Sequence, residues 1–310
     1  MGTRPSVTAL FVFTCMTAAG AQEPPREASA TTEQVKPGLY VLRSAGGTQV
    51  AGNVLAVIGD DSGVLVIDSG YPQFVPKYRE VLGALHGGPI THVINTHWHD
   101  DHSEGNKLFG ADGALIVAHT NAREMLMHDN KINVVRTVLD QPAFPPAALP
   151  VVTFDDRIEL YFGNERLELV HVSPAHTAGD VAVILRTSNV VHTGDVFASG
   201  RYPVIDVENN NGSVMGVLKA IDELIPTLDD FTKVIPGHGP VSTKKDVIAY
   251  RKMIHTVATR VEKLAKQGKT LEQVVAAKPL REYDEEWGKF RKTDSFVEMV
   301  YYGFVPYKPK

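Results

Sequence analysis

The stretch VINTHWHDDHSEGN, residues 93–106, holds three histidines and two aspartates within six positions, directly after an apolar run. VINT has the character of a buried strand, so HWHDDH lies on the loop that leaves its end. His97 and His99 are two apart and can point the same way in extended chain. Asp101 and His102 follow one turn later and can face a second ion. Imidazole and carboxylate are zinc ligands, so the full pattern favours a metal site over a solvated polar loop.

Three later segments can supply the further ligands that two ions need. SPAHTAGD carries His176, HTGDVF carries Asp195 and IPGHGP carries His238. Each residue comes soon after a β-like run and has glycine nearby, which permits tight backbone close to an ion. The carboxyl ends of strands are where open α/β sheets place their ligands. The sequence therefore predicts that these residues join the first cluster at one edge of a sheet.

The ordered series His-x-His-x-Asp-His, His-Thr-x-Gly, Thr-Gly-Asp and Gly-His-Gly resembles the motif set of the metallo-β-lactamase superfamily. The resemblance covers roughly Leu39 to Ser242 and includes Asp68, where the family carries a structural aspartate. It implies an α+β fold, an αββα sandwich of two mixed β-sheets flanked by helices. It also implies a dinuclear metal site at one edge of the sandwich.

The same resemblance implies a division of the ligands between two zinc ions, with iron or manganese as alternatives. The first ion would be held by His97, His99 and His176, the second by Asp101, His102 and His238, with Asp195 bridging both. Asp101 and Asp195 would also act in catalysis, by fixing a hydroxide shared by the two ions.

A chain of this kind is expected to hydrolyse a small ester, thioester, lactone or amide. β-Lactamases of the branch with the same first motif usually lack an aspartate at the position of Asp195, so we expect at most a weak β-lactamase activity. The chain looks most like exported, periplasmic members that carry this aspartate. Two alternatives stay open: an iron-dependent oxidoreductase of the same fold, similar to persulfide dioxygenases, and a non-catalytic metal-binding protein.

Substrate contacts are expected from ASGRYPVIDVENNNGS, residues 198–213, which must pass the metals after the Asp195 strand. Arg201 could pair with a substrate carboxylate, and Tyr202 could donate a hydrogen bond to an oxyanion. A surface loop with a solvated arginine is the alternative. The proline-rich segment 130–150 is predicted to be a long irregular loop, either a lid or a connector.

The chain divides into four predicted parts. Residues 1–21 have a short positive start, an apolar stretch and small residues before a cut, which is typical of a secretory signal peptide. Residues 22–36 are polar and are predicted to be a flexible linker, 37–260 the catalytic domain, and 261–310 a helical, aromatic-rich extension that packs on it. We therefore expect an exported protein, periplasmic or secreted, without a membrane anchor.

The composition of the chain indicates which classes of partner it can bind. The formal net charge is −5 and no block of basic residues appears, which disfavours nucleic acid and favours a small-molecule substrate. The single cysteine, Cys15, lies within the predicted signal peptide, so the mature chain must bind metal through His, Asp, Glu or Tyr. The oligomeric state is left open. Apolar spacing predicts helices over 74–85, from near Ser213 to Pro226, and from Thr243 onward.

Overall fold

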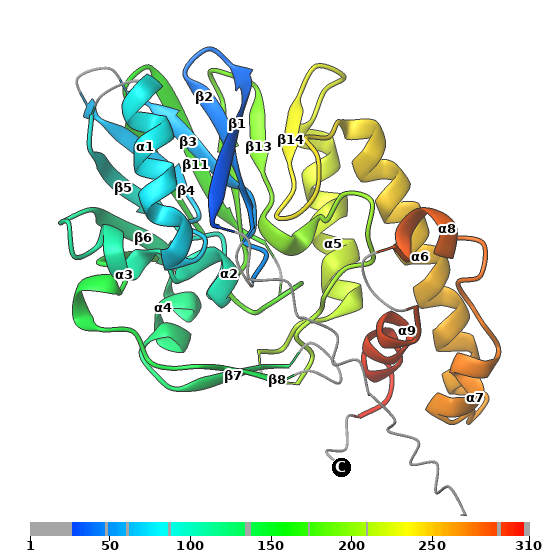
Figure 1. The fold of residues 1–310 in the computed structure, drawn as a ribbon. Coiled ribbons are helices and arrows are strands. Elements are labelled where there is room, and N and C mark those ends of the chain that lie inside the picture. The colour runs from blue at the N-terminus through cyan, green and yellow to red at the C-terminus, as the bar shows by residue number, and fades with distance from the viewer. Residues whose placement is uncertain are drawn as a thin grey trace, which may run out of the picture.

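The computed structural model describes residues 27–306, with the exception of 47–48, 60–61, 86–87, 134–137, 173, 209 and 290–292. The predicted signal peptide, residues 1–21, lies outside the described residues. Within them, two β-sheets lie in the middle of the molecule and helices flank them on both sides (Figure 1). The predicted α+β sandwich of mixed sheets is confirmed.

The first sheet has seven strands in the order β1-β2-β3-β4-β5-β6-β9. Strands β1 to β4 pair antiparallel, whereas β4, β5, β6 and β9 pair in parallel. The central strands are buried on both faces, which is why VLAVI and VLVI are apolar throughout. The strands are β1 (Ser29–Lys36), β2 (Leu39–Ala45), β3 (Val54–Ile58), β4 (Val64–Ile67), β5 (Ile90–Ile94), β6 (Leu115–His119) and β9 (Val152–Phe154).

The second sheet has five strands in the order β10-β11-β12-β13-β14. All neighbours pair antiparallel except β13 and β14, which are parallel. Parallel pairs end at the same edge of a sheet, so β4 with β5, and β13 with β14, each deliver two loops side by side. The strands are β10 (Arg157–Phe162), β11 (Glu165–His171), β12 (Val181–Leu185), β13 (Val190–His192) and β14 (Lys233–Ile235).

A hydrophobic core joins the inner faces of the two sheets. Leu55 and Ile67 of the first sheet belong to the same buried cluster as Leu169 and Val183 of the second. All four side chains are fully shielded from solvent. The two sheets therefore form one sandwich, and the loops at its edge are held in fixed relative positions.

Helices cover the two outer faces. On the first sheet, α1 (Val75–Leu85) buries Tyr78 and Leu82, as its predicted spacing requires. On the second, α5 (Val214–Leu224) and α6 (Lys244–Lys266) share a large core (Figure 1). The smaller helices near the site edge are α2 (Asp100–Ser103), α3 (Asn106–Phe109) and α4 (Thr120–Leu126).

The helix starts near Ser213 and Thr243 are confirmed. The Ser213 side chain accepts a hydrogen bond from the backbone N–H of Gly216 and caps α5. Thr243 and Asp246 form a reciprocal capping box at the start of α6. These caps end the loops that run from the metal edge of the sandwich to the outer helices.

Part of the predicted linker is wrong. Residues 29–36 form β1, which pairs with β2 as the edge of the first sheet. Its residues, SATTEQVK, are mostly exposed, so the strand lacks the apolar alternation by which strands are recognised. Its hydrogen bonds to β2 order this segment instead.

The prediction of an irregular loop over 130–150 is also wrong in part. This segment contains a two-stranded antiparallel ribbon of β7 (Asn130–Asn133) and β8 (Val138–Gln141). Gln141 and Ile132 are buried, and Phe144 packs with Trp98 in a small core. The ribbon thus rests on the loop that carries the first motif.

The predicted domain boundary at 260/261 falls inside α6, which is continuous to Lys266. The last part of the chain adds α7 (Leu271–Ala276), α8 (Asp284–Trp287) and α9 (Thr293–Tyr302), whose apolar residues enter the α5–α6 core. The boundary is therefore wrong, because one core includes both sides of it.

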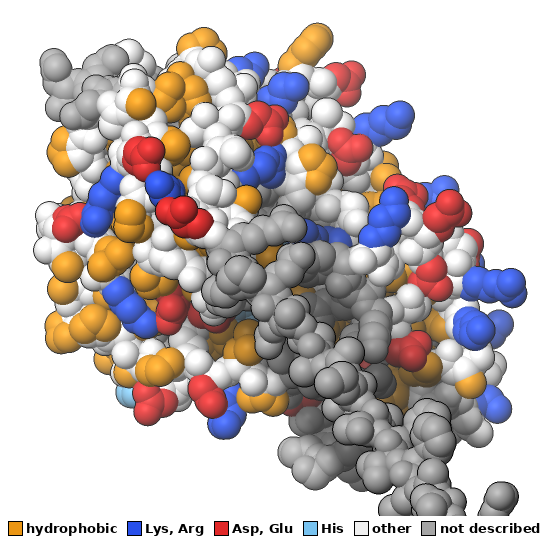
Figure 2. All heavy atoms as spheres, in the orientation of Figure 1, with side chains coloured by type: hydrophobic (Ala, Val, Ile, Leu, Met, Phe, Trp, Pro, Cys, Tyr) orange, Lys and Arg blue, Asp and Glu red, His pale blue; other side chains and the backbone are white. Residues whose placement is uncertain are grey.

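Two surface observations concern partners. Among the described residues, no helix combines the length and apolar character that crossing a membrane requires. On the face that Figure 2 shows, acidic and basic side chains are interspersed, so opposite charges lie near one another there.

Candidate metal centre

The seven predicted ligands meet at one edge of the sandwich. The loop after β5 and the short helix α2 carry His97, His99, Asp101 and His102, while the other three come from the loops that follow β11, β13 and β14. Three groups of ligand atoms each lie within 4.8 Å: His97, His99 and His176; His97, His102 and Asp195; Asp101, His102 and His238. The convergence that the sequence predicts is present.

Backbone hydrogen bonds fasten the two sheets together beside these side chains. The N–H of Val181 donates to the carbonyl oxygen of Thr96 at 2.8 Å, and the N–H of Asn53 donates to that of Gly237 at 2.7 Å. A Cβ at Gly237 would collide with the Asp195 carboxylate. Glycine there lets the β14 loop approach the cluster as closely as a shared site requires.

Each ligand histidine that follows β5 has a partner that orients its ring. The Nδ1 of His102 lies 2.7 Å from the Oδ2 of Asp68, and the Nδ1 of His97 lies 3.0 Å from the Thr96 hydroxyl. On His99 it is Nε2 that has a partner, 3.4 Å from the Oδ2 of Asp206. Such contacts fix which ring nitrogen is left for a metal.

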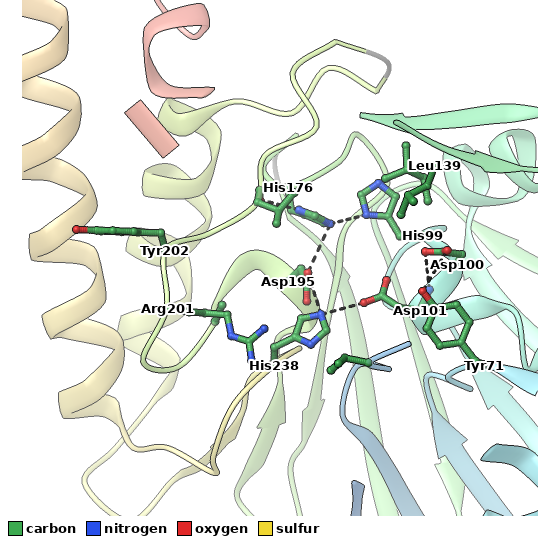
Figure 3. Close-up of a pocket in the computed structure, with 14 residues that line it drawn as sticks. Tyr71, His99, Asp100, Asp101, Leu139, His176, Asp195, Arg201, Tyr202 and His238 are labelled. Atoms are coloured by element: carbon green, nitrogen blue, oxygen red, sulfur yellow. Dashed lines mark hydrogen bonds and ion pairs between the residues drawn. The ribbon is translucent and has the colours of Figure 1, made fainter. Parts of the chain in front are cut away.

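His176 faces the cluster in the same manner. Its Nδ1 lies 2.8 Å from the carbonyl oxygen of Val204, and its Nε2 lies 2.8 Å from the Nδ1 of His99. Two imidazole nitrogens that face each other at this distance need either a shared proton or a cation between them. Figure 3 shows both rings directed toward Asp195 and His238 across the same space.

Carboxylate oxygens complete the donor set. The Nε2 of His238 lies 3.0 Å from the Oδ2 of Asp101 and 3.5 Å from that of Asp195. The carboxylate of Asp195 also lies 3.3 Å from His102 and 3.8 Å from His176, so it touches both halves of the cluster. This central place is the one expected of a bridging ligand.

Unsatisfied atoms test whether the cluster suits a metal. Among the described residues, His97 Nε2 is buried without a hydrogen-bond partner, and Asp195 Oδ1 makes no hydrogen bond although it lies 3.3 Å from the Nε2 of His102. Leaving an atom such as His97 Nε2 unpaired costs about 1–3 kcal/mol, and a cation between His97 and Asp195 would interact favourably with both. Imidazole nitrogens with carboxylate oxygens suit zinc, and also iron or manganese. The residues present therefore fit a metal.

Electrostatics agree with this fit. Burial and the neighbouring imidazoles of His102 and His176 hold the pKa of His97 well below its ordinary value. Burial likewise lowers the pKa of His176, with His99 adding to the effect. Both rings are thus neutral near pH 7 and have a lone pair to donate.

The surrounding charges shift the pKa values of His102 and Asp195 toward their charged forms. Burial opposes protonation of His102, but the carboxylates of Asp101 and Asp68 raise its pKa well above the ordinary value. Burial alone would raise the pKa of Asp195, but His238 and His102 hold it well below the ordinary range. A metal bound here must displace the His102 proton.

Three aspartates outside the predicted ligand set support the ligand histidines or the loops that carry them. Asp68, singled out by the resemblance, accepts hydrogen bonds from the backbone and hydroxyl of Thr96, both at 2.8 Å. Asp180 and Asp206 were missed. Asp180 could have been found from its place in HTAGD, four positions after the ligand His176, whereas nothing in the sequence pattern marks Asp206.

Asp180 shapes the His176 loop from within. Its Oδ2 accepts hydrogen bonds from the backbone N–H groups of His176 and Thr177, at 2.7 and 2.9 Å. Its Oδ1 accepts one from the Thr177 hydroxyl at 2.6 Å. Burial raises the pKa of Asp180, and these donors oppose that rise.

A cavity of about 240 Å³ opens over the cluster. Besides ligands it is lined by apolar side chains, among them Val50, Ile132, Leu139 and Val204. Arg201 lines it too, and Figure 3 shows its guanidinium directed toward His238. Pockets that combine apolar walls with a few polar groups are typical of small-molecule sites.

The prediction that Tyr202 donates to an oxyanion is wrong. Its hydroxyl donates instead to Asp284 at 3.0 Å, and its ring stacks on Phe296 with centroids 4.9 Å apart. Its backbone N–H donates to the carbonyl oxygen of Trp287. Figure 3 shows the ring pointing away from the cluster, because packing on the C-terminal helices buries its apolar surface.

Comparison with known proteins agrees with this architecture. Residues 47–240 match the family model of the metallo-beta-lactamase superfamily. A metallo-beta-lactamase type 2 from Elizabethkingia meningoseptica is 27% identical over 172 residues, 54% of this chain and 62% of that protein. A hydroxyacylglutathione hydrolase from Erythrobacter litoralis is 31% identical over 116 residues, 37% of each chain. The chain thus spans less than two thirds of the length of these relatives.

Solved structures show the same fold. A metallo-beta-lactamase from Pontibacter korlensis superimposes with a TM-score of 0.60 at 18% identity, covering 73% of this chain and 99% of that one. A stereoselective inverting sec-alkylsulfatase from Pseudomonas sp. superimposes with a TM-score of 0.65 at 17% identity, covering 90% and 51%. With its motifs, its sandwich and the family model in agreement, the chain belongs to the metallo-beta-lactamase superfamily.

Proposed function

We propose that this protein is a zinc-dependent hydrolase of a small ester, thioester, lactone or amide. The observation that carries the proposal is the convergence of five imidazoles and two carboxylates beside an apolar cavity, with Asp195 in contact with both halves of the cluster. Relatives named hydroxyacylglutathione hydrolase and metallo-beta-lactamase support a hydrolytic reaction.

The ligands would divide as the resemblance to the superfamily implies. His97, His99 and His176 would hold one ion; Asp101, His102 and His238 would hold the other; Asp195 would touch both. Bound zinc supplies Lewis acidity for a scissile carbonyl group and makes water acidic enough to ionise near neutral pH.

The chain's own residues do the rest. The carboxylates of Asp101 and Asp195 can accept hydrogen bonds from an attacking water and orient it toward the carbonyl carbon. Asp68 and Asp206 hold the rings of His102 and His99 at fixed angles. Arg201 at the cavity wall can bind an anionic group of the substrate, which positions the scissile bond.

The test is removal and return of the metal. Dialysis against a strong chelator should lower turnover of a panel of lactones, thioesters, aryl esters and β-lactams by at least about 100-fold, and zinc should restore it. His97→Ala should behave like the chelated protein. His128→Ala, which removes an exposed histidine away from the cluster, is the matched control and should retain activity.

Elemental analysis separates the alternatives. Zinc at about two ions per chain, with hydrolysis of at least one panel member, supports the proposal. Undiminished turnover in the demetallated protein would refute it. One tightly held iron per chain without hydrolysis would favour the oxidoreductase reading instead, and metal without any turnover would favour the binding protein.

A further inference from the structure

A carboxylate that belongs to none of the three ligand groups lies inside the cavity. Asp100 sits between the ligands His99 and Asp101 in sequence and lines the cavity with them. Its Oδ1 accepts a hydrogen bond from the Asp101 backbone N–H at 2.9 Å, and its Oδ2 accepts one from the Tyr71 hydroxyl at 3.1 Å. Figure 3 shows Asp100 and Tyr71 together at one side of the cluster.

Both of these donors are neutral. Tyr71 is itself buried against the first sheet, with only 5% of its surface exposed, and it holds the carboxylate at the cavity wall. A carboxylate that is mostly removed from water, beside a second carboxylate, gains from a cationic partner. The cavity is where such a partner can reach it.

A positively charged side chain lies across the cluster from the Asp100 carboxylate. Arg201 lines the same cavity, and in Figure 3 it stands on the far side of Asp195 and His238 from Asp100. The reacting centre therefore has a guanidinium on one side and a non-ligand carboxylate on the other. Val50, Leu139 and Ile132 provide apolar wall for the part of a ligand that spans them.

From this arrangement we propose that the site selects zwitterionic substrates, with an anionic group at Arg201 and an ammonium or similar cation at Asp100, on either side of the scissile bond. The proposal rests on the proposed function for the position of that bond. It adds Asp100 as a specificity residue, and Tyr71 as the residue that positions it.

Binding of unreactive probes tests this without turnover. The probes are 6-aminohexanoate, hexanoate, hexylamine and the neutral reference hexanamide, which share a six-carbon chain and differ in the charged or polar groups at its ends. Calorimetry on the zinc-loaded protein should give 6-aminohexanoate an affinity about tenfold above that of hexanoate and of hexylamine. Equal affinities of the zwitterion and hexanoate would overturn the proposal.

Two variants test which side chain binds the ammonium group of the probe and which binds its carboxylate. Asp100→Asn should reduce the advantage of the zwitterion over hexanoate to about twofold or less, and Arg201→Ala should do so for its advantage over hexylamine. Asp100→Ser serves if the first variant folds poorly. Glu104→Gln is the matched control: it removes a negative charge outside the cavity lining, where Glu104 pairs with Lys107, and should keep the full preference.

An amine can also bind zinc directly, and the variants exclude that reading. Direct coordination would survive Asp100→Asn, so a preference that persists in this variant contradicts the proposal. Failure here is distinct from failure of the proposed function. Hydrolysis of the neutral esters with no zwitterion preference refutes only the selectivity, whereas a preference without hydrolysis of any panel member refutes only the reaction.

Discussion

At the metal centre, the loops that carry Thr96 and Thr177 are each held by the same arrangement of hydrogen bonds to an aspartate. In the first sheet, Asp68 accepts hydrogen bonds from the backbone and hydroxyl of Thr96; in the second, Asp180 does the same for Thr177. Each threonine is the chain neighbour of a ligand histidine. The two arrangements differ in sequence separation: Asp180 is three positions from its threonine, whereas Asp68 is 28 positions away, directly after the neighbouring strand β4.

This difference in sequence separation distinguishes contacts that shape a single loop from contacts that depend on two paired strands. The Asp180 contacts close one turn and need only the loop itself. The Asp68 contacts exist only when β4 and β5 have paired, and Asp68 also holds the ring of His102. We infer that Asp68 links the metal centre to the integrity of the first sheet, whereas Asp180 governs a single loop.

The largest effect is expected for Asp68→Ala. The substitution leaves His102 and the Thr96 N–H buried without their partner, and breaking a buried pair of this kind costs about 3–5 kcal/mol of unfolding free energy. Urea unfolding of the metal-free protein measures this loss, and elemental analysis of the loaded protein measures how much metal the variant still binds. A loss below about 1 kcal/mol would contradict the long-range role.

A smaller effect is expected for Asp180→Ala. It removes acceptors for local donors, so unfolding free energy should fall by about 1–3 kcal/mol, with weaker metal binding at His176. The same urea titration reports it. If Asp180→Ala costs as much as Asp68→Ala, the distinction between the two loops is lost.

Asp206→Asn should alter metal affinity more than stability. It weakens the contact to the Nε2 of His99, and loss of an outer-shell partner typically lowers metal affinity by about 10–100-fold. Competition with a chromophoric chelator measures this. Glu208→Gln removes the same charge from the same segment and is the control; an equal drop in both variants would point to net charge rather than ring orientation.

The smallest effect is expected for Arg201→Ala. It should raise KM for anionic substrates by about five- to tenfold and change KM for neutral analogues by less than about twofold. Steady-state kinetics on a matched pair of charged and neutral esters provides the measurement. Equal changes for both would remove the carboxylate role of Arg201.

Sequence reasoning succeeded where burial imposes a pattern. Strands such as β3 and β4 lie between two layers, so their residues must be apolar, and the ligand motifs directly follow strands. It failed where exposure or distance removes the pattern. The edge strand β1 is polar because one face and one edge meet water, and the ribbon β7–β8 is short and largely exposed.

The same reasoning explains the misread side chains. Arg201 and Tyr202 both line the cavity, and composition alone cannot tell which of them directs its polar group toward the metal cluster. The outcome depends on Phe296 and Asp284, far along the chain, which hold the Tyr202 side chain. Asp206 was missed for a similar reason, because only the folded loop brings it to His99.

The anchoring of Tyr202 has a consequence for how this protein can change. Its hydroxyl is bound to Asp284, 82 positions downstream, and its backbone to Trp287, yet the short segment around it also supplies Arg201 and Asp206. The C-terminal helices thus hold the segment that forms part of the cavity rim in place. Substitutions in that tail can retune which molecules are admitted, and how one imidazole is aligned, while every ligand stays in place.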